Sequence, residues 1–360
     1  MVACLPITGM MGGLIYLGLY NKTSNWAWRA GLMADIAGPA IALLILPFAP
    51  ESIRWLVAEG RADEAFEVLV KIRQRTRNDP KILAEFQQIK QTIELERQLS
   101  QRDSWKSLVS PARNFRRFLI TVLTNLFFQT NGSNFLPYFF TIIIRGTGVT
   151  NTFTLLQVNV GLTAWAAACS IFGVWFVSKM GRRSSFLIGT MVIAASFATL
   201  AILQQHIEAT NQAAFAKGAV AVCFIFYWAA FSSWMLLNYS YPPEILKYTQ
   251  RARGVGVGQA LGYLVGAGLS YAIPLAIQNL SWRYYILNCL WNVPIFVVIW
   301  WLFPETKGKT LEEIDSIFDG SAAKSSLQVI EGLPDPFIEG GHHEVKLKEL
   351  KDSQVGTSAQ

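Results

Sequence analysis

Long apolar stretches dominate the pattern of hydrophobic and polar residues along this chain. A hydrocarbon core of about 30 Å is crossed by roughly 20 apolar residues in a helix, and eight stretches are candidates for such a crossing. They cover residues 3–20, 30–49, 118–143, 153–178, 185–204, 217–240, 254–278 and 284–303. The first is short, contains Pro6, and lacks the basic residues that precede the apolar core of a signal peptide. We therefore predict an all-α membrane protein with about eight transmembrane helices.

The segment between the second and third apolar stretches follows a different pattern. Apolar residues recur there at helical spacing in two groups, which Asp79-Pro80 separates. The groups are Ala62, Ala65, Phe66, Leu69 and Val70, and then Ile82, Phe86, Ile89 and Ile93. We predict two amphipathic helices that bury their apolar faces against the cytoplasmic ends of the spans. After about residue 320 the chain is polar, and we expect it to be disordered.

Basic residues are distributed unevenly among the connections between spans. Residues 51–117 hold 14 Lys and Arg, whereas residues 205–216 hold none. Two further basic connections carry Lys179, Arg182 and Arg183, and Lys247, Arg251 and Arg253. Cytoplasmic loops of membrane proteins are enriched in Lys and Arg. We therefore place these connections in the cytoplasm, and with eight spans both termini lie there too.

The composition excludes several classes of function. Hydrophobic residues make up 52% of the chain and charged residues 15%, whereas soluble proteins carry about 25% charged residues. The net charge of +7 comes from basic residues beside apolar stretches, so we expect contact with the lipid bilayer and no nucleic-acid partner. The four cysteines and three histidines have neither metal-ligand spacing nor a catalytic arrangement. We therefore expect no enzymatic activity, no cofactor and no metal.

The third apolar stretch is interrupted by polar residues. It reads FQTNGSN at 128–134, followed by Pro137-Tyr138. Amides inside a span are costly unless they face a partner or a cavity. Gly132 and Pro137 are expected to loosen the helix, and broken helices mark the binding sites of many transporters. Amides offer paired donors and acceptors that suit sugar hydroxyls, and the alternative is hydrogen bonding between helices.

Charged motifs lie at the ends of four predicted spans. They read PESIRWL at 50–56, KMGRR at 179–183, YPPEIL at 241–246 followed by RARG at 251–254, and PETKGKTLEEID at 304–315. In this order the motifs resemble those of the sugar porter family of the major facilitator superfamily, in its fungal type. The resemblance covers residues 1–320, and the last string is the most specific signature.

The resemblance implies a partial major facilitator fold. Family members have twelve helices in two six-helix halves, and PES-R follows their sixth helix but the second predicted span here. The chain thus resembles helices five to twelve and lacks about four N-terminal helices, so we do not expect these 360 residues to transport alone. The expected regions are 1–50 (last helices of the N-terminal half), 51–117 (cytoplasmic linker), 118–303 (C-terminal half) and 304–360 (cytoplasmic tail).

The resemblance also implies a role for the charged motifs. In the family such a cluster forms a latch that holds the cytoplasmic side closed, and carboxylates can form bidentate hydrogen bonds with guanidinium groups at span ends. The alternative is that the basic residues set only the topology. The expected gating or structural residues are Glu51, Arg54, Gly181, Arg182, Arg183, Glu244, Arg251 and Glu305.

The match to the family's sugar-binding positions is incomplete. The third stretch resembles the family string QQ-x-x-G-x-N, except that Phe128 replaces its first Gln. Ala166, Phe231 and Tyr239 stand at other contact positions and put ordinary hexose specificity in doubt. Asn238 shares a helical face with Trp234 and Tyr241, which serves either binding or packing. The expected substrate-binding residues are Gln129, Asn134, Tyr138, Asn238 and Tyr239.

Together these features predict a multi-pass carrier of the plasma membrane that moves a sugar or similar polyol by alternating access. The alternative is a membrane sensor or interacting partner that binds without flux. Proton coupling is not determined by these residues, because the coupling groups of related symporters usually lie in the four helices that are absent here.

Overall fold

The computed structural model describes residues 4–22, 24–74, 76–102, 105–110, 112–146, 151–210, 213–309, 313–314 and 317–318. Every regular element within these ranges is helical. The chain divides into two units, residues 1–307 and 308–360, and the architecture below is that of the first. The predicted disorder after residue 320 falls outside the described residues.

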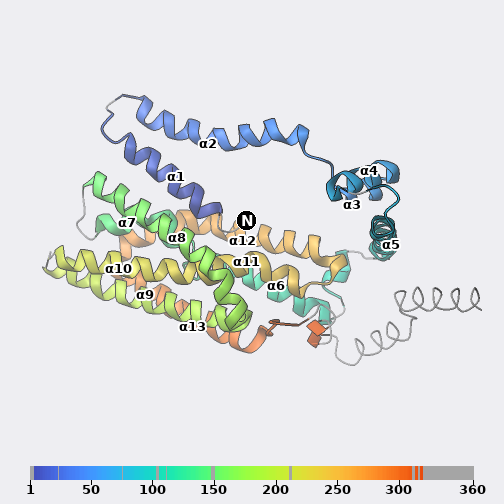
Figure 1. The fold of residues 1–360 in the computed structure, drawn as a ribbon. Coiled ribbons are helices and arrows are strands. Elements are labelled where there is room, and N and C mark those ends of the chain that lie inside the picture. Colours follow the sequence, from blue (N-terminus) through green and yellow to red (C-terminus); the bar gives the residue numbers. More distant parts are fainter. Residues whose placement is uncertain are drawn as a thin grey trace, which may run out of the picture. The chain divides into compact units, whose positions relative to one another are not determined.

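The helices follow one another with short connections (Figure 1). Helices α1 to α5 are Cys4–Gly18, Trp26–Ile45, Ile53–Ala58, Ala62–Arg73 and Pro80–Arg102. Helices α6 to α9 are Ala112–Thr130, Phe135–Gly146, Thr152–Met180 and Arg182–Thr210. Helix α10 (Ala213–Ala229) continues through a π-helical turn (Ala230–Trp234) into α11 (Met235–Ile245), and α12 (Tyr248–Leu280) and α13 (Trp282–Leu302) follow. Short 3-10 helices cover Leu46–Phe48 and Trp105–Leu108.

Six stretches among the described residues are long and apolar enough to cross a membrane. They are Trp28–Phe48, Thr152–Met180, Arg182–Ala209, Lys217–Ile245, Gln250–Leu280 and Trp282–Leu302. Each coincides with one of the predicted spans. The first predicted span is the shorter apolar helix α1, which has 15 residues. The structure divides the third predicted span into α6 and α7, with a non-helical break between Thr130 and Phe135 that contains Gly132, where the sequence predicts a loosened helix.

The helices of the first unit pack in pairs, and the first half of the broken span takes part in two of them. Helix α6 packs along α12 and α11, α9 packs along α13 and α10, and α1 packs along α8. The core between these helices is rich in aromatic rings, and Phe186, Phe197, Phe226 and Trp234 are fully buried. Close packing of large rings gives little freedom to the backbone beside them.

Helices α3, α4 and α5 bury their apolar faces against one another. Leu56 of α3, Ala65 and Leu69 of α4, and Ile82 and Phe86 of α5 form one buried cluster. The prediction that these faces pack against the ends of the spans is corrected by this cluster, and among the described residues α5 also contacts α12. Each amphipathic helix finds an apolar partner in its neighbour along the chain, which buries the apolar face without help from the membrane helices.

Candidate functional site

The break between α6 and α7 is held in a defined shape. The Asn131 side chain accepts a hydrogen bond from the backbone N–H of Ser133 (2.8 Å). The Nδ2 of Asn292, on α13, donates to the carbonyl oxygen of Asn131 (3.1 Å). Asn131 and Asn292 are 0% and 1% exposed. Since a buried carbonyl freed from a helix must find a donor, α13 supplies the group that allows the helix to break here.

Gly132 has a backbone conformation that other residues rarely adopt. Its φ angle is +96°, and a Cβ atom at this position would lie 2.4 Å from the ring of Phe197. Glycine is therefore required both by the turn and by the packed ring beside it. Pro137, which was expected to loosen the helix as well, lies in the first turn of α7, where a missing N–H costs nothing.

A polar pocket of about 230 Å³ opens beside the break. The Nδ2 of Asn134 donates a hydrogen bond to the Oε1 of Gln129 (2.7 Å). Tyr138 of α7 and Tyr263, Gly266 and Ser270 of α12 complete the polar side of the lining. The amide pair uses one donor and one acceptor, and each amide has further hydrogen-bonding capacity. The structure thus brings three of the five expected substrate-binding residues together.

The other two expected binding residues lie on α11 and differ from each other. The hydroxyl of Tyr239 is 3.4 Å from the hydroxyl of Tyr263, which lines the polar pocket. Asn238 is buried and is not part of that lining. It shares its helical face with Trp234, which donates from Nε1 to Thr190 (3.2 Å) and packs edge-on against Phe186. Tyr241, on the same face, also packs edge-on against Phe186.

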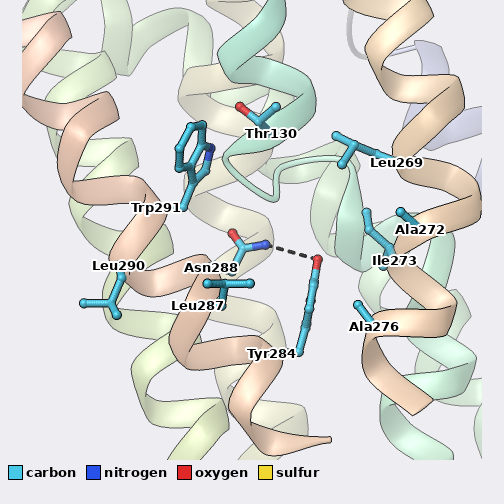
Figure 2. Close-up of a pocket in the computed structure, with 10 residues that line it drawn as sticks. All are labelled: Thr130, Leu269, Ala272, Ile273, Ala276, Tyr284, Leu287, Asn288, Leu290 and Trp291. Atoms are coloured by element: carbon cyan, nitrogen blue, oxygen red, sulfur yellow. Dashed lines mark hydrogen bonds between the residues drawn. The ribbon is translucent and has the colours of Figure 1, made fainter. Parts of the chain in front are cut away.

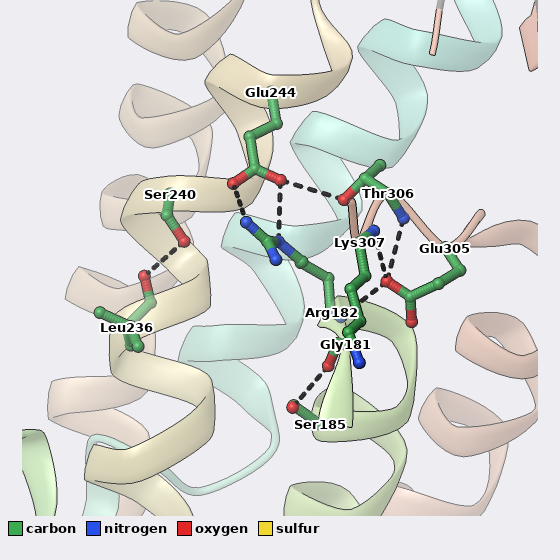
Figure 3. A network of polar contacts seen from close by, with 9 residues as sticks. All are labelled: Gly181, Arg182, Ser185, Leu236, Ser240, Glu244, Glu305, Thr306 and Lys307. Atoms are coloured by element: carbon green, nitrogen blue, oxygen red, sulfur yellow. Dashed lines mark hydrogen bonds and ion pairs between the residues drawn. The ribbon is translucent and has the colours of Figure 1, made fainter. Parts of the chain in front are cut away.

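A network of charged residues joins the ends of α8, α9, α11 and α13 (Figure 3). The guanidinium of Arg182 donates one hydrogen bond to each carboxylate oxygen of Glu244, and both bonds are 3.1 Å long. The side chains are 25% and 27% exposed. The hydroxyl of Thr306 donates to the same carboxylate (3.0 Å). Bidentate geometry and partial burial make this ion pair stronger than an exposed one.

Glu305 caps the first turn of α9. Its carboxylate accepts the backbone N–H groups of Arg182 (2.8 Å) and Arg183 (3.0 Å). Both are N-terminal amides of the helix without intrahelical partners, and the positive end of the helix dipole favours an anion there. Gly181 has a φ angle of +93°, and a Cβ atom there would lie 2.5 Å from a carboxylate oxygen of Glu305. Glycine at 181 therefore makes room for the cap.

The remaining gating candidates occupy other positions. Glu51 accepts a hydrogen bond from the N–H of Ser52 (3.4 Å) just before α3, and Arg54 lies in α3. Arg251 lies in the first turns of α12. Arg117 was counted only among the 14 basic residues of the connection 51–117, but the structure buries it completely, and its Nη1 donates to the carbonyl of Ile245 at the end of α11 (3.1 Å). The string ARNFRRF at 112–118 gave no signal that sets Arg117 apart from Arg113 and Arg116.

Comparison with known proteins gives matches over most of the chain. A family model described as "Sugar (and other) transporter" matches residues 3–318. The sugar transporter STL1 of Saccharomyces cerevisiae is 29% identical over 313 residues, which are 86% of this chain and 54% of that protein. The MFS-type transporter oryC of Aspergillus oryzae is 27% identical over 316 residues, which are 86% of this chain and 58% of that protein. The chain spans just over half the length of these relatives.

Solved structures resemble the fold. The xylose transporter XylE from E. coli, in a partially occluded inward-open conformation, has a TM-score of 0.65 at 20% identity. The match covers 86% of this chain and 63% of that one. The inward-open form of XylE has a TM-score of 0.64 and covers 85% and 62%. The predicted fold class, a partial major facilitator fold, is confirmed by this likeness.

Proposed function

Because the chain belongs to the family of sugar (and other) transporters, we propose that it binds a sugar or similar polyol and takes part in its transport by alternating access. The observation that carries this proposal is the amide pair Gln129–Asn134 in the polar pocket beside the helix break. The break in the helix exposes these two amides to a cavity inside an otherwise apolar span. Broken helices of this kind form the binding sites of many transporters.

The chemistry of the pocket suits a polyhydroxylated ligand. Its polar lining consists of two amides and the hydroxyls of Tyr138, Tyr263 and Ser270. Among the described residues, no charged side chain lines it. Amides and hydroxyls each combine donors with acceptors, which matches a neutral ring or chain of hydroxyl groups. We place Tyr239 at the edge of this site through its contact with Tyr263. Asn238 supports the site by packing.

The charged network is proposed as the latch of the cytoplasmic side. Arg182 and Glu244 join α9 to α11, and Glu305 joins the end of α13 to the start of α9. Any motion that separates these helix ends must break the bidentate pair and the cap. A network that links several helix ends to one another is suited to hold a closed state. Basic residues that only set the topology need no carboxylate partners.

The location proposed for the protein is the plasma membrane, with both termini in the cytoplasm. The basic residues Lys179, Arg182 and Arg183 support this orientation because cytoplasmic connections are enriched in Lys and Arg. We assign residues 51–117, with α3, α4 and α5, to the cytoplasmic linker between the two halves of the transporter. The proposed activity is transport without chemical conversion of the ligand.

Substitution of the amide pair tests the proposal. In the purified chain in lipid nanodiscs, Gln129→Leu and Asn134→Leu should each weaken binding of the preferred ligand by about two- to tenfold, because one neutral hydrogen bond contributes about 0.5–1.5 kcal/mol. The measurement is equilibrium binding across a panel of labelled hexoses, pentoses and polyols. Gln157→Leu is the matched control, since Gln157 is exposed on α8 and does not line the pocket. Unchanged affinity in both pocket variants would rule the site out.

A further inference from the structure

An apolar groove lies directly beside the polar pocket. Its volume is about 510 Å³, and it runs between α12 and α13 below the end of α6 (Figure 2). Leu269 and Ile273 of α12 line both the groove and the polar pocket. Thr130, at the end of α6, lines the groove next to Gln129, which lines the pocket. The two cavities therefore adjoin across two hydrocarbon side chains.

The lining of the groove is mostly apolar. Figure 2 shows Leu269, Ile273 and Ala276 on one helix facing Leu287 and Trp291 on the other. The polar side chains that reach the groove from α13 are bonded to each other, with Asn288 Nδ2 donating to the Tyr284 hydroxyl over 3.2 Å. No charged residue lines it among the described residues. A polar ligand group would gain little there, whereas an alkyl group would be removed from water.

The polar pocket by itself is small. Cavities that enclose ligands of drug size have volumes of about 300–1,000 Å³, and the polar pocket has about 230 Å³. A ligand larger than a single small polyol must therefore extend beyond it. Leu269 and Ile273, the two residues that the linings share, mark the side on which the adjoining space is apolar.

We infer that the ligand of this site is amphiphilic: a polyhydroxylated head held by Gln129 and Asn134, with a hydrocarbon substituent in the groove between α12 and α13. This inference rests on the proposed function and narrows its substrate class. For a sugar or polyol that carries an apolar group, burial of that group in the groove adds binding free energy to that of the hydrogen bonds in the polar pocket.

Alkyl glucosides of different chain length test the inference. Binding of methyl and hexyl β-D-glucoside is measured on the purified chain in lipid nanodiscs, below the concentrations at which the hexyl compound forms micelles. Each fully buried methylene strengthens binding about fourfold, and because the groove lining is partly exposed we expect the hexyl compound to bind at least tenfold more tightly. Partition of the alkyl chain into lipid produces the same order, so variants are needed to locate the effect.

Ala276→Trp fills the groove and should remove the advantage of the hexyl chain while methyl glucoside binds as before. The matched control is Leu264→Trp on the same helix, which is 70% exposed and lines neither cavity; it should keep the advantage. An equal advantage in the wild type and in Ala276→Trp would overturn the inference, as would equal binding of both glucosides in the wild type. In either case Gln129-dependent binding of a panel sugar would leave the transport proposal standing. Absence of binding by every panel sugar would contradict both.

Discussion

Replacement of Gly132 by alanine should destabilise the purified chain by about 2–5 kcal/mol and abolish ligand binding. A residue with a side chain costs about 1–2 kcal/mol at a positive φ angle, and overpacking of a dense core adds about 1–3 kcal/mol. Here the φ angle is +96° and the new methyl group would meet the ring of Phe197, which is fully buried. The break cannot relax freely, because Asn292 holds the adjoining carbonyl. Thermal unfolding in detergent and equilibrium binding measure the two effects.

Gly268→Ala is the matched control for this substitution. Gly268 lies inside α12, and a Cβ atom there meets nothing within 4 Å, so alanine should leave stability unchanged or raise it slightly. A second variant, Gly132→Ala combined with Phe197→Leu, should recover part of the stability because it removes the clash but keeps the strained backbone. If Gly132→Ala unfolds at the temperature of the wild type and binds ligand normally, the described geometry of the break is wrong.

Removal of the Arg182 side chain should open the side of the protein that the proposed latch closes. The pair with Glu244 is bidentate and about three-quarters buried. Its worth should therefore lie between that of an exposed pair, about 0–1 kcal/mol, and that of charge-assisted hydrogen bonds, about 1.5–3 kcal/mol. We expect a shift of about 1–2 kcal/mol, or roughly five- to thirtyfold in the population of the open state. Glu305→Gln should act in the same direction by weakening the cap on α9.

A cysteine at Ser240 reports this opening. Ser240 lies on α11 one turn before Glu244 (Figure 3), and the partly exposed Cys4 and Cys289 are replaced by serine so that only the buried Cys169 and Cys223 remain. Arg182→Ala should raise the rate of labelling by an impermeant thiol reagent, and Arg182→Lys should give an intermediate rate because lysine keeps the charge but loses the planar fork.

The matched control for the latch is Arg61→Ala. Arg61 pairs with Glu64 in the linker with the same chemistry, but both side chains are about half exposed. The hydrogen bond from Arg61 lowers the pKa of the Glu64 carboxyl below its ordinary value, and the pair joins no helix ends. Its loss should leave labelling at position 240 unchanged. Equal labelling of wild type and Arg182→Ala would favour the interpretation in which basic residues set only topology.

The sequence predicted six of the eight spans well because these six are long and apolar. It also placed Gln129 and Asn134 together, since amides in an apolar run need a partner or a cavity. It also indicated a loosened helix at Gly132, where the third span breaks. It did not indicate the group that stabilises the break. That group is Asn292, which lies 161 residues from Asn131 along the chain and bonds to its carbonyl, and no local pattern links the two.

Other differences have the same origin in long-range packing. Trp234, Asn238 and Tyr241 lie on one helical face, but only the ring contacts with Phe186 show that this face is packed. The amphipathic linker helices were recognised from their periodicity, yet periodicity does not say which partner buries an apolar face. The motifs predicted that the charged side chains of Glu305 and Arg182 would meet. The structure shows a different contact, in which Glu305 accepts the backbone N–H of Arg182 and caps α9.

Protection of a cysteine at Ser270 tests most directly whether the pocket beside the break holds a polyol. Ser270 lines the pocket and is exposed, and its substitution by cysteine in the background without Cys4 and Cys289 gives one reactive thiol there. The preferred sugar or polyol of the binding panel should slow labelling of this thiol, its mirror-image form should not, and Asn134→Leu should weaken the protection. Labelling that neither enantiomer slows, or that both slow equally with and without Asn134, would contradict the account.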